Sequence, residues 1–226
     1  MATLRREIAQ AAAGAARTVD SVTLLAVSKG HPVSSIRAAA QLGVRDFAES
    51  YLQEALPKLA ALRDLTLTWH FIGRIQGNKT RDIAEQFDWV HGIDRWRIAE
   101  RLAAQRPFHA PPLQACIQVN IGADPAKAGI APEAAADLAY AMLDLPRVRL
   151  RGLMCILPGG GSEAEHRAHF AALRQLLQDI NAQRPPHAPP LDTLSMGMSD
   201  DFPAAIAEGA TLVRIGTALF GARPEV

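Results

Sequence analysis

The sequence has few of the features that mark a secreted, metal-binding or membrane protein. It has only two cysteines, Cys116 and Cys155, and both lie in apolar runs, so we expect reduced core thiols rather than a disulfide or metal framework. The seven histidines are scattered without metal-ligand spacing, and we predict no metal site. No stretch reaches the roughly 18 apolar residues that a membrane span needs, and charged residues interrupt the N-terminal segment where a signal peptide would be apolar. We therefore expect a cytoplasmic protein without membrane contact.

Net charge is also small. The chain carries 24 basic and 23 acidic residues, a net charge of +1, and no long basic block. This balance gives no electrostatic reason to expect nucleic acid or an anionic membrane as a partner. The Walker motif, GxGxxG after a strand and GxSxG are absent as well.

Short apolar runs alternate along the chain with segments of helical periodicity. The runs predict strands at 23–29, 45–48, 67–73, 89–93, 113–121, 148–156, 192–197 and 212–216. Between them the periodicity predicts helices at 36–42, 51–62, 79–87, 96–105, 132–143, 163–181 and 202–208. An alanine-rich helix over roughly residues 3–17 comes before the first strand.

This alternation indicates an α/β fold with parallel strands and right-handed crossovers. Eight strands in 226 residues, of which 49% are hydrophobic, fit a single (β/α)8 TIM barrel at the small end of that class. We expect one domain over residues 1–226, with the N-terminal helix covering the gap that an eighth helix would fill. Periodicity alone leaves a doubly wound open sheet as the alternative.

Lys29 ends the first predicted strand and is followed by the turn-like segment Gly30-His31-Pro32. An ammonium at the mouth of a buried strand is partly desolvated, which lowers its pKa and favours attack on a carbonyl. Taken alone, Lys29 is more simply explained as a surface lysine that ends a strand. The rest of the chain reverses that preference.

In a TIM barrel, ligands bind at the C-terminal ends of the strands, and the last two predicted strands end in polar residues there. The run 195–201 leads from strand to helix and provides either an anion site or an ordinary N-cap at Ser199 or Asp200. At the end of the last strand, Gly216 permits close backbone approach and Thr217 adds a hydroxyl. Arg214 could meet a ligand ring nitrogen or an anion, or else pair with a strand-end carboxylate.

Two other strand ends carry candidates with a simpler structural explanation. His70 sits between two aromatics, where a histidine is more often packed in the core than catalytic. After the second strand, Glu49 is the stronger candidate for a functional role, and Ser50 is expected to cap the next helix.

These motifs together resemble one family, the small pyridoxal 5′-phosphate (PLP)-binding proteins of the YggS/PROSC type, also called PLP homeostasis proteins. The resemblance extends from Leu24 to Gly221. It rests on Ala26-Val27-Ser28-Lys29, Phe47-Ala48-Glu49-Ser50-Tyr51, Trp69-His70-Phe71-Ile72-Gly73, Gln76, Asn78-Lys79, Val119-Asn120-Ile121, Lys127, Gly129, Gly152-Leu153-Met154, residues 194–201 and residues 213–221. Ordered motifs over this length are highly specific.

The resemblance implies a barrel like the N-terminal domain of alanine racemase, with Lys29 holding PLP as an aldimine. It further implies that Ser199, Gly216 and Thr217 bind the phosphate and that Arg214 faces the pyridine nitrogen. Further cofactor contacts are expected from His70, Ser195, Met196 and Ser50. The sequence departs from the family pattern in three places: Ala48 and Ser50 replace a glycine and an asparagine, and Gly30 stands where threonine is common.

The resemblance implies a PLP-binding protein of intracellular PLP (vitamin B6) homeostasis, without substantial catalysis, that passes PLP to PLP-dependent apo-enzymes. The first alternative is an amino-acid racemase or related PLP enzyme on the same barrel. A two-base racemase needs a second base opposite the lysine, and neither Tyr51 nor Tyr140 is an obvious one. The second is a Schiff-base aldolase, whose lysine typically sits on a later strand. We expect a monomer.

Overall fold

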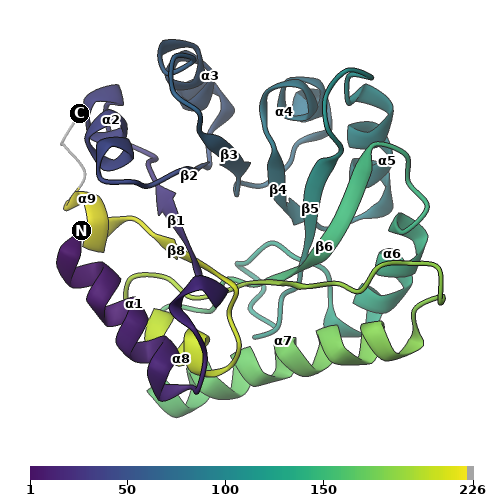
Figure 1. Cartoon of the computed structure of the whole chain (residues 1–226). Helices are drawn as coiled ribbons and strands as arrows, with labels where there is room; N and C mark the ends of the chain where they lie inside the picture. Colours follow the sequence, from purple (N-terminus) through teal and green to yellow (C-terminus); the bar gives the residue numbers. More distant parts are fainter. Residues whose placement is uncertain (223–226) are drawn as a thin grey trace.

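The computed structural model describes residues 1–222 and contains a closed barrel of parallel strands in sequence order (Figure 1). The strands are β1 (Thr23–Val27), β2 (Asp46–Glu49), β3 (Thr68–Phe71), β4 (Trp89–Ile93), β5 (Leu113–Gln118), β6 (Val148–Met154), β7 (Thr193–Ser195) and β8 (Leu212–Ile215). Because β1 pairs with β8 as well as with β2, the sheet has no edges. The predicted barrel is confirmed, and the open doubly wound sheet is excluded.

Helices follow the strands and surround the barrel. They are α1 (Ala2–Gly14), α2 (Val33–Gln41), α3 (Leu52–Ala61), α4 (Thr80–Gln86), α5 (Trp96–Gln105), α6 (Ala135–Met142), α7 (Glu163–Gln183), α8 (Phe202–Ala207) and α9 (Thr217–Phe220). Short 3-10 turns, η1 (Val19–Ser21), η2 (Gly77–Lys79) and η3 (Pro132–Ala134), precede β1, α4 and α6. The helix α5 has the predicted bounds, and most others begin or end within a few residues of the prediction.

Several strands are shorter at their C-terminal ends than the apolar runs predicted. β1 ends at Val27, although the Ser28 N–H still donates to Ala48 O at 3.0 Å. Lys29 therefore lies in the turn beyond the strand. The predicted bounds run past the paired residues into the turn, where single backbone hydrogen bonds such as that of Ser28 remain.

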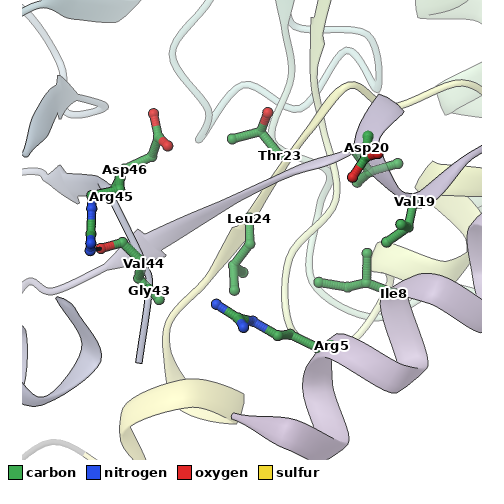
Figure 2. Close-up of a pocket in the computed structure, with 11 residues that line it drawn as sticks. Arg5, Ile8, Val19, Asp20, Thr23, Leu24, Gly43, Val44, Arg45 and Asp46 are labelled. Atoms are coloured by element: carbon green, nitrogen blue, oxygen red, sulfur yellow. Dashed lines mark hydrogen bonds between the residues drawn. The ribbon is translucent and has the colours of Figure 1, made fainter. Parts of the chain in front are cut away.

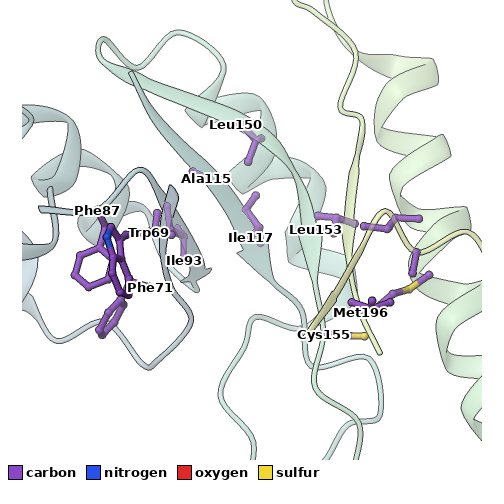
Figure 3. Close-up of a cluster of buried hydrophobic side chains, with 14 of the residues drawn as sticks. Trp69, Phe71, Phe87, Ile93, Ala115, Ile117, Leu150, Leu153, Cys155 and Met196 are labelled. Atoms are coloured by element: carbon purple, nitrogen blue, oxygen red, sulfur yellow. The ribbon is translucent and has the colours of Figure 1, made fainter. Parts of the chain in front are cut away.

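Alternation along the strands separates two apolar clusters. The larger lies between sheet and helices, and Figure 3 shows part of it, including Trp69, Phe71 and Phe87. The smaller lies inside the barrel and consists of Leu25, Val27 and Ala48, with Ile72 packed against it. Buried polar side chains also lie in this interior, among them His91 and Arg214.

The N-terminal helix α1 lies beside α8, near the short α9 that follows β8 (Figure 1). Its buried face consists of Leu4, Ile8 and Ala12, spaced four residues apart as one helical face requires. Just after the helix, Arg17 Nη1 donates to Ile206 O at 3.0 Å. The position agrees with the prediction that this helix covers the place of a long eighth helix.

In the part of the chain that the structure describes, no helix has both the length and the apolar character needed to cross a membrane. The same residues contain no group of three or more histidine, cysteine or acidic side chains that could hold a metal ion.

Gly152 tests the packing of β6 against β7, because the two strands pair at Gly152 and Thr193. A Cβ at residue 152 would lie 1.9 Å from Thr193 O and 2.7 Å from its carbonyl carbon, and backbone cannot move aside cheaply. We expect Gly152→Ala to lower the free energy of unfolding by about 2–3 kcal/mol, the upper range for overpacking, as measured by urea denaturation. Gly14→Ala is the control, since no atom lies within 4 Å of the added methyl. Equal stability of the two variants would contradict this close packing of the two strands.

Candidate functional site

The pairing of β1 with β8 brings the two most informative sequence motifs together at one barrel mouth. Leu25 pairs with Arg214 and Ala26 with Ile215, so the chain beyond each strand emerges at the same C-terminal end. Lys29 lies two residues beyond Val27, which itself lies two beyond Leu25, and both of these face the barrel interior. Lys29 is half-buried in this position.

The loops after β7 and β8 meet beside this lysine. The Ala218 N–H, one residue after Thr217, lies 3.4 Å from Ser199 Oγ. The loop that carries Lys29 reaches the same place, because the His31 ring lies 4.9 Å from the Phe220 ring of α9. A Cβ on Gly216 would make only ordinary contact, at 3.4 Å from Val27 O, so close backbone approach is not what requires glycine there.

The acidic residues in the β7–α8 loop turn away from this meeting point. Asp201 Oδ1 accepts from the Met198 N–H at 2.6 Å and so closes its own turn. Asp200 lines a different cavity of about 440 Å³, together with Gly161 and His166. Their carboxylates therefore do not prevent the Ser199 region from accepting an anion.

Arg214 is buried in the barrel interior and is held by neutral oxygens. Its Nη1 donates to Ser195 O at 2.6 Å and to Ser195 Oγ at 2.9 Å, and its Nη2 donates to Cys155 O at 2.7 Å. Burial lowers the pKa of Arg214 from its ordinary value, but a guanidinium stays charged in proteins. The acceptors observed here are not the carboxylate partners that the simpler sequence-based alternative requires.

A chain of hydrogen bonds, here called the interior relay, crosses the barrel from Arg214 to Asp46. Ser195 Oγ lies 2.8 Å from His91 Nδ1, His91 Nε2 lies 3.0 Å from His70 Nδ1, and His70 Nε2 lies 3.1 Å from Asp46 Oδ1. His91 lies in the middle of the strand predicted at 89–93, and no role was predicted for it.

The carboxylate of Asp46 fixes the direction of every bond in this relay. It only accepts, so His70 donates from Nε2 and, when neutral, accepts at Nδ1. His91 must then donate from Nε2 and accept at Nδ1, which makes the Ser195 hydroxyl a donor. Burial lowers the pKa of both histidines, and for His91 the neighbouring His70 and Arg214 lower it further. The lowered pKa of both histidines favours the neutral rings on which these bond directions depend.

Two residues expected at the cofactor have side chains that do not point into the C-terminal mouth. The His70 ring borders a cavity of about 300 Å³ at the N-terminal ends of the strands, with Thr23, Asp46 and Trp89, which is the end opposite Lys29. The Met196 side chain is fully buried in the outer apolar cluster (Figure 3). Both side chains are buried. The sequence did not show how deep His70 lies within the barrel, or that the Met196 side chain points outward.

Ser50 lies at the rim of the C-terminal mouth. It borders a cavity of about 290 Å³ with Tyr51, Gln76 and Lys79. It does not cap α3 as expected, because the N-cap position is Tyr51 and no side chain caps the helix.

The cavity in Figure 2 is large, but it lies away from the C-terminal mouth, so cavity volume alone does not identify the candidate site. It measures about 420 Å³ and lies between α1, η1 and the starts of β1 and β2, with Arg5, Asp20 and Thr23 in its wall. This is again the N-terminal end of the barrel. The C-terminal mouth is distinguished instead by the amine after β1, the guanidinium on β8 and the hydroxyls in the loops after β7 and β8.

Comparison with known proteins agrees with the barrel. The family model for the alanine racemase N-terminal domain matches residues 2–224. The chain is 55% identical over 223 residues to the pyridoxal phosphate homeostasis protein of Pseudomonas aeruginosa, covering 99% of this chain and 94% of that protein. It is 47% identical over 226 residues to the protein of the same name from Escherichia coli (strain K12), covering 99% and 95%.

Solved structures give the same result. PipY of Synechococcus elongatus PCC7942, solved with PLP bound, is 43% identical with a TM-score of 0.82, covering 95% of this chain and all of that one (100%). Alanine racemase of Corynebacterium glutamicum is 17% identical with a TM-score of 0.69, and the match covers 96% of this chain and 60% of that one. The racemase likeness therefore supports the fold alone.

The interior relay predicts how stability depends on pH. An unfolded histidine binds a proton near its ordinary pKa of about 6.5, whereas His91 in the folded protein has a lowered pKa, so acid favours the unfolded chain. Stability should therefore fall as pH drops from 7 to 5. We expect His91→Gln to reduce this slope by up to about 1.4 kcal/mol per pH unit, measured by urea denaturation at several pH values. His109→Gln, at an exposed position, should keep the slope of the unmodified protein. A His91→Gln variant with an unchanged slope would refute the neutral buried histidine.

Proposed function

This chain belongs to the pyridoxal phosphate homeostasis proteins of the alanine racemase N-terminal domain family, and from that premise we propose that it binds PLP covalently at Lys29. When bound, PLP supplies an aldehyde that condenses with a lysine amine, and a conjugated ring that absorbs visible light. The observation that carries the proposal is the convergence of Lys29, Arg214 and the Ser199–Thr217 region at one mouth, in a family where PipY has been solved with PLP.

The residues at this mouth fit such a ligand. Ser199 and Thr217 contribute hydroxyls, and Gly216 a backbone N–H, where a phosphate needs donors. Within residues 1–222, three of the five N–H groups of Arg214 donate to protein oxygens, which leaves two for a ring nitrogen. A cation facing that nitrogen keeps it unprotonated, because its charge opposes a second cation. Ser195 contributes by holding Arg214.

The site residues support cofactor holding better than turnover. A racemase of the two-base kind needs a second proton-transferring group opposite the lysine. Tyr140 is on α6, and its hydroxyl lies 3.4 Å from Ile180 O, on the helical shell. Tyr51 lies on the rim and is 64% exposed, so its side chain is not held opposite the lysine. We propose a PLP-binding protein of vitamin B6 homeostasis without substantial catalysis.

Location, release and assembly complete the proposal. The protein would hold PLP in the cytoplasm and release it to PLP-dependent apo-enzymes. It would act as a monomer, because one chain contributes the lysine, the arginine and the hydroxyls. Both cysteines are free and buried, and burial raises the pKa of each to about 12, so neither is a reactive thiol.

Lys29→Ala tests the proposal directly. We expect the unmodified protein to gain a visible absorbance band with PLP, to lose it on borohydride reduction, and to show the modification at Lys29 by peptide mapping. The variant should lack the band and bind PLP only weakly, through the phosphate contacts. Lys79→Ala, a lysine at the mouth rim, is the control and should behave as the unmodified protein.

Two results would change the assignment. A protein that gains no band with PLP would refute PLP binding at this lysine. Robust turnover of alanine or another amino acid in a chiral assay would replace the homeostasis function by a racemase.

A further inference from the structure

The backbone on both sides of Lys29 is tied to a group of charged residues, two of them buried, that the sequence did not connect with it. This group, here called the lysine support, consists of Glu49 at the end of β2 and of Glu54 and Lys58 on α3. Glu49 is fully buried and Lys58 is 7% exposed. Lys58 Nζ donates to Glu49 Oε1 at 2.8 Å and also to Glu54 Oε1, so one cation joins the two carboxylates.

Each residue adjacent to Lys29 is bound by the lysine support. Ser28 O accepts from Lys58 Nζ at 2.8 Å, and Ser28 Oγ donates to Glu49 Oε1 at 2.6 Å. On the other side, the Gly30 N–H donates to Glu54 Oε1. The peptide groups that set the direction of the Lys29 side chain are therefore fixed from both ends.

Gly30 makes this arrangement possible. Its φ is 76°, a left-handed conformation that glycine adopts without the cost that a Cβ imposes. This conformation presents the Gly30 N–H to Glu54. Glycine stands at the position where threonine is common in the family, and the loop is nevertheless held here by the hydrogen bond from the Gly30 N–H to Glu54.

Stability alone does not account for the lysine support. Within the described residues, Glu49 Oε2 is buried without a hydrogen-bond partner. Burial raises the pKa of Glu49, although Lys58 and Ser28 both act to lower it. Removing charges from water is costly, and such a group stabilises a fold poorly compared with apolar residues of the same size. What it does provide is a fixed geometry at the one residue that the chemistry needs.

We propose that Glu49, Glu54 and Lys58 are positioning residues that hold Lys29 in the orientation from which its amine reaches the aldehyde of PLP. The proposal rests on the proposed function of Lys29 and adds to it the residues that prepare the lysine. It acts through the main chain of Ser28 and Gly30. None of the three needs to touch the cofactor.

Glu54→Ala is the most informative variant, because Glu54 is partly exposed and its removal releases the Gly30 N–H without leaving Lys58 unpaired. We expect the rate of covalent attachment of PLP, followed by visible absorbance, to fall about tenfold, as for the loss of one hydrogen bond to a charged group. Glu54→Gln keeps the acceptor oxygen and should stay within about twofold of the unmodified protein. Glu100→Ala, on the exposed face of α5, is the matched control.

A second background separates positioning from general damage to the pocket. In Lys29→Ala, where only noncovalent binding remains, Glu54→Ala should leave the dissociation constant of PLP unchanged, because its effect passes through Lys29 alone. In the cofactor-free protein, Lys29 can be labelled with a small amine-reactive reagent at several pH values. The pH dependence of the labelling rate should differ between Glu54→Ala and the unmodified protein. Ser28→Ala removes the contact with Glu49 and gives the same test from the other side, should Glu54→Ala fail to fold.

The outcomes are distinct. Unchanged attachment in Glu54→Ala and in Ser28→Ala, with the unmodified protein attaching PLP normally, would overturn the positioning role and leave the proposed function intact. An equal loss of affinity in the Lys29→Ala background would show a pocket effect and overturn it as well. If the unmodified protein does not attach PLP at all, the proposed function fails and the positioning role with it.

Discussion

The lateral pairing of β1 with β8 is the constraint on which the rest of this structure depends. It closes the barrel, and it is the reason that residues from the two ends of the chain meet. Lys29 lies just after the first strand, whereas Arg214 lies on the last strand and Gly216 and Thr217 come directly after it. In an open sheet with β1 and β8 at separate edges, these residues would be far apart. The site is therefore a consequence of closure before it is a consequence of any single side chain.

Closure also creates an interior that must be filled, and this chain fills much of it with polar groups. The interior relay is one such network. The lysine support lies outside the barrel wall, between β2 and α3, because Glu49 follows the inward-facing Ala48 and contacts Lys58. In both networks nearly every donor has an acceptor. Such networks stabilise little in total, but they tolerate few alternative arrangements, because a half-satisfied buried network is costly. The first network holds Arg214 and the second holds the backbone of Lys29. Arg214 and Lys29, which face the proposed ligand, are thus each held by a hydrogen-bond network on the side away from it.

The accuracy of the sequence-based predictions follows from the physics of each signal. Apolar runs located all eight strands, because the strands of a parallel barrel are buried on both faces. The ends of β1 and β3 were placed two residues too late, because a run of residues does not mark where regular strand pairing gives way to a turn. His70 was expected at the cofactor, yet its ring faces the opposite mouth, since periodicity gives the face of a strand but not the depth within a barrel. Lys58 was not identified, because nothing in a helical segment indicates that its amine reaches the carbonyl of Ser28.

The sequence by itself determined the strand and helix order, the family, and the lysine, arginine and hydroxyl residues that the family motifs carry. It could do so because alternation and motif order are local properties of the chain. Only the tertiary structure decided which buried groups support them. The tautomers of His70 and His91 are set by Asp46, and the direction of Lys29 by Glu49, Glu54 and Lys58. These are contacts between elements distant in the chain, and their geometry exists only once the barrel has closed.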